Sequence, residues 1–123
     1  MAGFIERAHW KSFLDEFSKR NQLRATRLEV VGEIGDQEEE EYLPLVGVSF
    51  EPKGAAAGSV QIILGGETTK DPRHVDHTVA NVEQIAPLVG INSIDDGLGI
   101  VDKDGSKTLL LFEALPELPP ATA

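Results

Sequence analysis

Histidines are the first residues of this chain to consider for metal or acid–base chemistry. His74 and His77 flank Val75 and Asp76, which makes an i, i+3 pair of imidazoles. On a strand such residues point to opposite faces, so they could share a metal only across a bulge or on a helical turn, with a third ligand from elsewhere. His77 falls on the apolar face with Val75 and Val79, which favours a partly buried, hydrogen-bonded histidine over a ligand or a catalyst.

Carboxylates are abundant, but their spacing completes no cation site. The first, third, fifth and twelfth positions of a calcium loop are matched by Asp102, Asp104, Ser106 and Glu113. The sixth position, which requires glycine for a sharp turn, is Lys107, and strand-like residues stand where helices should flank the loop. Glu38–Glu41 place four like charges in a row, which indicates a solvated turn rather than a metal site.

Motifs for nucleotide binding and covalent catalysis are also incomplete. Gly54–Ser59 resembles part of a phosphate loop, but it lacks the lysine after the second glycine, and a strand rather than a helix follows. No serine stands in a G-x-S-x-G sequence. The chain contains no cysteine, which removes disulfides, thiolate zinc sites and cysteine nucleophiles. We therefore expect no cofactor, no metal and no catalytic residue, and nothing in the sequence argues for an enzyme.

The net charge of −10 is unevenly distributed, with a balance of +3 in residues 1–27 and −13 in the remainder. A negative field repels nucleic acid and anionic membranes from most of the surface. The basic segment is more typical of complementarity within the chain or between subunits. The first residues lack a signal peptide, and no apolar run is long enough to span a bilayer, so we expect a cytoplasmic protein without a membrane partner.

The elements that would position these residues are one helix followed by strands. Apolar residues recur at i, i+3, i+4 and i+7 at Trp10, Phe13, Leu14 and Phe17. This period predicts an amphipathic helix, which Asn21 could end in the left-handed conformation. After Arg24 the period becomes two, which predicts strands. The expected strands are Thr26–Val30, Leu43–Phe50, Ser59–Leu64, Val75–Val79 and the arms of a hairpin at 98–101 and 108–112.

Three segments need separate interpretation. Gly32–Glu41 is expected to be a loop. Val82–Ile94 contains Pro87, which leaves either a short helical turn or an edge strand. Asp102–Gly105 predicts a type I turn with Gly105 left-handed. The whole predicts an α+β fold in which the N-terminal amphipathic helix packs on a bent, mostly antiparallel sheet or small barrel of about six strands. Residues 1–114 would form this single domain, and residues 115–123 a proline-rich C-terminal tail.

Several segments together resemble a small bacterial family known only as a domain of unknown function. The resemblance rests on a W-x-x-F-L helix from Trp10, a G-x-Q-x-E loop from Gly35, a Leu-Pro-Leu-x-Gly strand from Leu43 and a D-x-D-G hairpin from Asp102. It covers nearly the whole chain and departs from the pattern at residues 65–73, which look like an insertion. The resemblance implies a small bacterial cytoplasmic protein and supplies no reaction or catalytic residue.

Three hypotheses about function follow. The leading one is a non-enzymatic protein-interaction or homo-oligomerising module, whose contact is formed by an edge strand or by a helix face of Trp10, Phe13 and Phe17. The alternative is a small-ligand or metal-binding protein, enzymatic or not, with a site near His77, Gln37 and the Glu38–Glu41 loop. A third and weaker hypothesis is nucleic-acid binding through Lys19, Arg20, Arg24 and Arg27.

Overall fold

A computed structural model describes residues 4–32, 35–38, 42–54, 57–65, 74–90 and 95–113 of the chain. The 3-10 turn η1 (Arg7–His9) leads into helix α1 (Trp10–Arg20). The strands that follow are β1 (Ala25–Gly32), β2 (Gly35–Glu38), β3 (Leu43–Glu51), β4 (Ser59–Gly65), β5 (His74–Val79), β6 (Val82–Val89), β7 (Asp95–Asp102) and β8 (Lys107–Phe112). All their pairings are antiparallel, which confirms the α+β fold.

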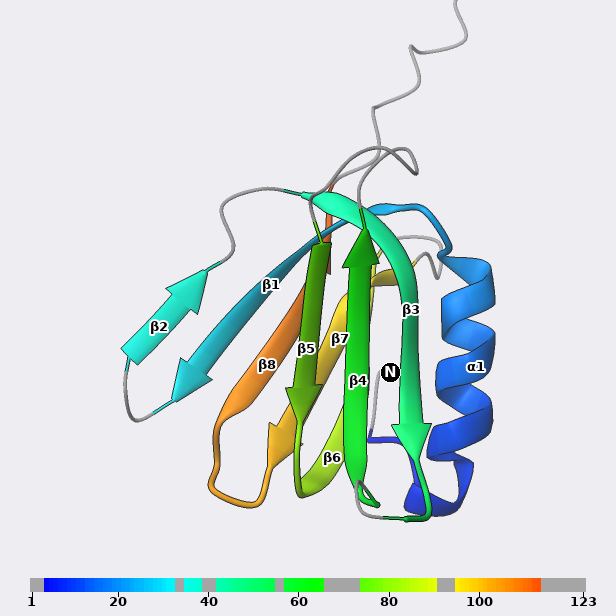
Figure 1. Cartoon of the computed structure of the whole chain (residues 1–123), viewed down its shortest axis with the longest axis vertical. Helices are drawn as coiled ribbons and strands as arrows, with labels where there is room; N and C mark the ends of the chain where they lie inside the picture. Colours follow the sequence, from blue (N-terminus) through cyan, green and yellow to red (C-terminus); the bar gives the residue numbers. More distant parts are fainter. Residues whose placement is uncertain are drawn as a thin grey trace, which may run out of the picture.

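The strands form one sheet in the order β5-β4-β3-β1-β8-β7-β6, and β2 also pairs with β1. β1 meets β3 only at Ala25 and Thr26, whereas it pairs with β8 from Thr26 to Val31. Because β1 and β3 diverge after two residue pairs, the sheet bends into a β3–β4–β5 layer and a layer of β1, β8, β7 and β6 (Figure 1). The sheet is bent as expected and is not closed into a barrel.

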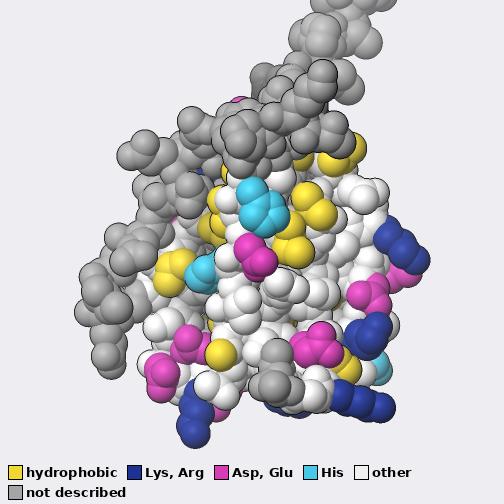
Figure 2. Space-filling model, in the orientation of Figure 1, with side chains coloured by type: hydrophobic (Ala, Val, Ile, Leu, Met, Phe, Trp, Pro, Cys, Tyr) yellow, Lys and Arg dark blue, Asp and Glu magenta, His cyan; other side chains and the backbone are white. Residues whose placement is uncertain are grey.

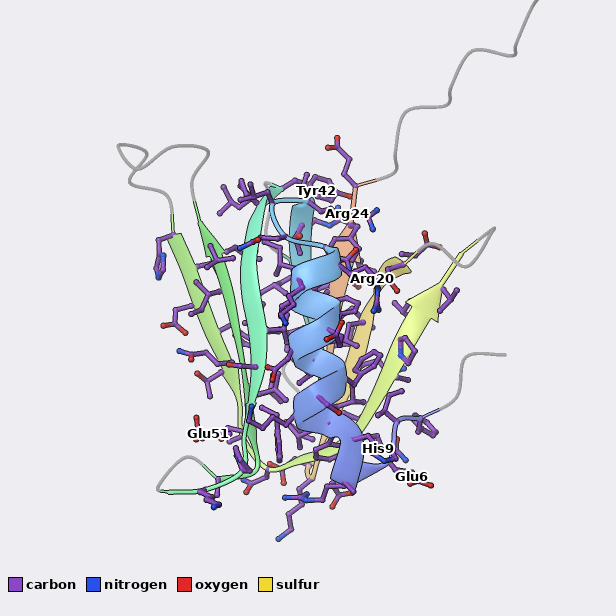
Figure 3. All side chains as sticks on the ribbon, turned by 90° about the vertical axis from the view of Figure 1, so that its right-hand side faces the viewer. Glu6, His9, Arg20, Arg24, Tyr42 and Glu51 are labelled. Carbon is purple, nitrogen blue, oxygen red and sulfur yellow. The ribbon has the colours of Figure 1, made fainter. Side chains whose placement is uncertain are left out.

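Helix α1 fills the opening between the two layers (Figure 3). Its predicted apolar stripe faces inward, and Trp10 and Phe17 are only 2% and 0% exposed to solvent. The Trp10 ring meets Phe50 of β3 edge-on, with the ring centroids 5.2 Å apart. The Phe17 ring stacks on Phe112 of β8 at 5.7 Å. The helix therefore joins the two layers, and each buried side chain of this size contributes about 1.5–3 kcal/mol.

The loop predicted for Gly32–Glu41 is wrong for Gly35–Glu38. These residues form β2, which pairs with Glu29–Gly32 of β1. A charge-rich segment becomes a strand here because the part of β1 that has left β3 presents unpaired backbone groups, which β2 satisfies. Glu39–Glu41 lie outside the described residues, as do residues 66–73 and the predicted tail.

Three turn and edge predictions have different outcomes. Val82–Val89 is the edge strand β6, one of the two alternatives, and Pro87 is tolerated at this edge. Gly105 has the expected positive φ of 86°. Asn21 does not end the helix in the left-handed conformation, because its φ is −116°. Leu23 takes that conformation instead, with φ of 70°, while the Asn21 side chain makes buried hydrogen bonds.

Candidate functional site and interaction surfaces

The helix residues predicted to form a contact lie mostly in the core. Trp10 and Phe17 are buried against both sheet layers, and Phe13 is partly buried beside them. The indole Nε1 of Trp10 also donates to the carbonyl oxygen of Ile5 at 2.8 Å. Of the predicted helix-face contact, only Phe13 keeps a substantial accessible surface, and its part in an interaction stays a prediction.

His77 and Gln37 lie on strands that are not neighbours in the sheet. His77 is opposite Ile62 of β4, on the core-facing side of β5, and is partly exposed, as the alternation indicates. His74 points to the other face. Gln37 lies on β2 opposite Val30, so β4, β3 and β1 separate its strand from β5 in the sheet order. No three metal-ligating side chains cluster within the described ranges, and a ligand or metal site near His77 stays a prediction.

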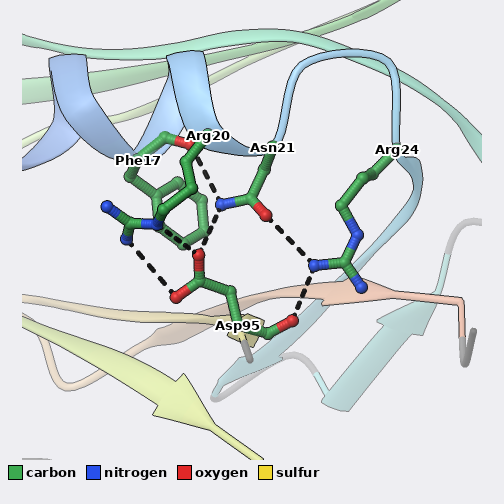
Figure 4. A network of polar contacts seen from close by, with 5 residues as sticks. All are labelled: Phe17, Arg20, Asn21, Arg24 and Asp95. Carbon is green, nitrogen blue, oxygen red and sulfur yellow. Dashed lines mark hydrogen bonds and ion pairs between the residues drawn. The ribbon is translucent and has the colours of Figure 1, made fainter. Parts of the chain in front are cut away.

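A network of charged and polar side chains lies instead where α1 ends and β7 begins (Figure 4). The Asp95 carboxylate accepts hydrogen bonds from Arg20 Nε at 2.7 Å and from Asn21 Nδ2 at 2.8 Å. Asn21 Nδ2 also donates to the carbonyl oxygen of Phe17 at 3.0 Å. Arg24 Nη1 donates to the backbone oxygen of Asp95 at 2.7 Å and to Asn21 Oδ1 at 3.0 Å.

Electrostatics holds Asp95 in its ionised form. Burial alone would raise the pKa of this carboxyl group, because it disfavours the charge. The hydrogen bonds from Arg20 and Asn21, together with the charges of Arg20 and Arg24, outweigh burial and lower the pKa of Asp95 below its ordinary value. The same hydrogen bond to Asp95 raises the pKa of Arg20.

This network is an internal clamp rather than a reaction centre. The carboxylate that could act as a base is occupied by donors, and both arginines that could bind an anion are engaged, with Arg24 also over the Phe112 ring at 4.2 Å. Arg20 at the basic helix end is thus paired with a carboxylate of the same chain. This role is hard to predict from sequence, because Asp95 is separated from Arg20 by 75 residues and looks like a turn residue beside Asp96.

Two edges of the bent sheet are hydrogen-bonded to the N-terminal part of the chain. Where β3 leaves β1, Ser18 of α1 accepts a hydrogen bond from the Val48 amide and donates one to the Val48 carbonyl, both at 2.8 Å. At the β6 edge, the amide of Ile5 donates to the carbonyl of Ile85 at 2.8 Å. β5 ends the sheet order on the other side and pairs only with β4.

The outer faces of both layers carry polar and apolar side chains. On the β3–β4–β5 layer, polar side chains surround a shallow hollow (Figure 2), and those lining it are Ser49, Glu51, Ser59, Gln61 and Thr78. On the other layer the outward residues of β8 are Lys107, Leu109 and Leu111. The two leucines lie between charged residues of β1, Glu29 and Arg27, and the small residues Gly99 and Gly97 of β7, beyond which Ala86 and Leu88 of β6 follow. Both leucines of β8 are only half-buried.

No helix in the described part of the chain is long and apolar enough to cross a membrane. No solved structure matches the chain. An uncharacterized protein of the bacterium Aquifex aeolicus is 33% identical over 116 residues, which cover 94% of this chain and 95% of the relative. The model of a family of unknown function (DUF5335) matches residues 2–121. These matches agree with the resemblance found in the sequence, and the chain belongs to this family.

Proposed function

We propose that the protein is a non-enzymatic interaction module that self-associates through the outer face of β8, β7 and β6. The observation that carries this proposal is the pair of outward leucines on β8. Thr108, Leu110 and Phe112 point into the core and are buried, while Leu109 and Leu111 point outward. Antiparallel strands with one face in water normally alternate apolar and polar residues, so two outward leucines on a strand whose other face is in the core favour a second covering layer over them.

The shape of this face favours a second copy of the chain as the covering layer. Leu109 and Leu111 lie along β8 opposite Gly99 and Gly97, two residues of β7 without a side chain. A two-fold axis through the face would pack the leucines of each copy against β7 of the other, which is the self-complementary arrangement of an isologous dimer. The half-buried leucines would then lose their remaining contact with water.

Net charge opposes this association and supplies a test. Two copies of net charge −10 repel each other, and salt screens that repulsion. Apolar burial is not weakened by salt. We therefore expect self-association to strengthen as ionic strength rises, whereas a contact held by surface ion pairs would weaken.

The experiment is sedimentation of the wild type and of two lysine variants at increasing salt. Leu109→Lys places a charge in the proposed contact and should weaken association by a factor of about ten or more, since losing one buried leucine costs about 1.5–3 kcal/mol. Ile63→Lys is the matched control, because Ile63 is also a half-buried strand residue, on β4 of the other layer. A wild type that stays monomeric at high protein and salt concentration would refute the proposal.

A further inference from the structure

β5 is an edge strand whose outer side makes no hydrogen bond with the described part of the chain. The edge of β3 is bonded to Ser18, the edge of β6 is bonded to Ile5 at one residue and contains Pro87, and β2 is only four residues long. Natural proteins protect sheet edges with proline, lysine, bulges or covering segments. β5 has no proline or lysine, and its register with β4 runs without a shift from Val79 to His74.

The charged side chain of β5 does not protect its edge either. Asp76 is drawn across the sheet face by Gln61 of β4, whose Nε2 lies 3.0 Å from Asp76 Oδ1. The side chain therefore lies over the neighbouring strand rather than at the free edge. Among the described residues, none hydrogen-bonds to the backbone groups along the outer side of β5, so these groups can accept another strand.

We infer that β5 pairs antiparallel with β5 of a second copy, with the two-fold axis at His77. The inference rests on the proposed function only in making a second copy the partner, because it uses a different surface. Strand addition at an open edge satisfies the backbone groups of both partners and continues the sheet across the axis. A second copy offers an edge of the same length and the same unprotected character.

The register follows from the faces and charges of β5. Residues opposite each other across an antiparallel pair lie on the same face, so odd positions must meet odd positions. An axis at Asp76 would set the two Asp76 carboxylates against each other, which is destabilising. An axis at His77 instead sets Asp76 against the partner's Thr78 and Val75 against the partner's Val79. Five residues of β5, from Val75 to Val79, then pair in each copy.

The absence of cysteine from the chain makes this register directly testable. Residues at the axis of an antiparallel pair have Cα atoms roughly 4.5–5.5 Å apart, within the range that a disulfide spans. Oxidation of a His77→Cys variant should therefore join two chains. Because pairing raises the effective concentration of the two thiols, we expect crosslinking to be roughly tenfold or more faster than at an unpaired position.

His74→Cys is the matched control on the same strand. In the proposed register the two Cys at this position are six residues apart along the pair, roughly 20 Å, which no disulfide spans. Rapid crosslinking at position 77 with slow crosslinking at position 74 supports the inference. Slow crosslinking at position 77, or faster crosslinking in an Asp76→Cys variant, overturns it. Circular dichroism of each reduced variant checks that it is folded.

The sedimentation and crosslinking experiments test the two proposed contacts independently. If Leu109→Lys abolishes association while position 77 does not crosslink, the apolar face stands and the β5 contact is refuted. If position 77 crosslinks and Leu109→Lys changes nothing, the β5 contact stands and the apolar face is refuted. If both surfaces are used, the wild type forms assemblies larger than a dimer, and the loss of either surface leaves a dimer.

Discussion

Replacing Asp95 with asparagine tests the clamp between α1 and β7 with almost no change in shape. The variant loses the negative charge of the carboxylate that accepts hydrogen bonds from Arg20 and Asn21 (Figure 4). The Arg20 side chain is 50% exposed, so its ion pair contributes only about 1 kcal/mol or less. The Asn21 bond is buried, and a buried hydrogen bond to a charged group contributes about 1.5–3 kcal/mol. We expect Asp95→Asn to lower the free energy of unfolding by about 2–3 kcal/mol at pH 7.

The direction of the pKa shift of Asp95 decides how the loss of stability in this variant changes with pH. The folded pKa of Asp95 is lower than its unfolded pKa, so the ionised carboxylate stabilises the folded state above the unfolded value. The difference between wild type and variant should be constant from pH 7 down to about pH 5 and should shrink below about pH 4, as the wild-type carboxyl becomes protonated. Urea unfolding curves measured at each pH supply both free energies.

Asp96→Asn is the control for the Asp95 experiment, because Asp96 is the next residue and is exposed. It should change stability by less than about 0.5 kcal/mol. An Asp95→Asn variant as stable as Asp96→Asn would refute the clamp. So would a difference from the wild type that stays the same at pH 3 as at pH 7, because the charge of Asp95 would then not be its source.

Two further substitutions test how the sheet is held. Ser18→Ala removes both hydrogen bonds to Val48 and should cost about 1–3 kcal/mol in urea unfolding, since two backbone groups at the β3 edge lose their partner. Gly97→Ala would drive a new Cβ into the backbone carbonyl of Leu110 and should cost about 1–3 kcal/mol, whereas Gly99→Ala meets only ordinary contacts at 3.7 Å and should fold normally. A Gly97→Ala variant as stable as Gly99→Ala would contradict the close approach.

Helix α1 is a feature that the local sequence pattern is sufficient to predict. The spacing of Trp10, Leu14 and Phe17 specifies an apolar face, and that face is buried. The turn at Asp102–Gly105 is equally local, because Asp102 Oδ1 accepts from the amides of Asp104 and Ser106 at 2.9 and 3.0 Å. Such features depend on residues within four positions of each other, so they can be predicted before any tertiary contact is known.

Features that depend on distant partners could not be predicted in this way. Asp95 has the same sequence surroundings as a turn aspartate, and only the arrival of the helix end makes it a buried anion. β2 is a strand because β1 leaves β3 after two residue pairs. The candidate surfaces are of the same kind: the alternation along β5 and β8 assigns side chains to faces, but the sheet order decides which face meets water and which edge stays open. Local sequence thus determined the helix, the Asp102–Gly105 turn and most of the strands, whereas strand order, a property of the whole chain, decided that β2 is a strand and what the elements expose.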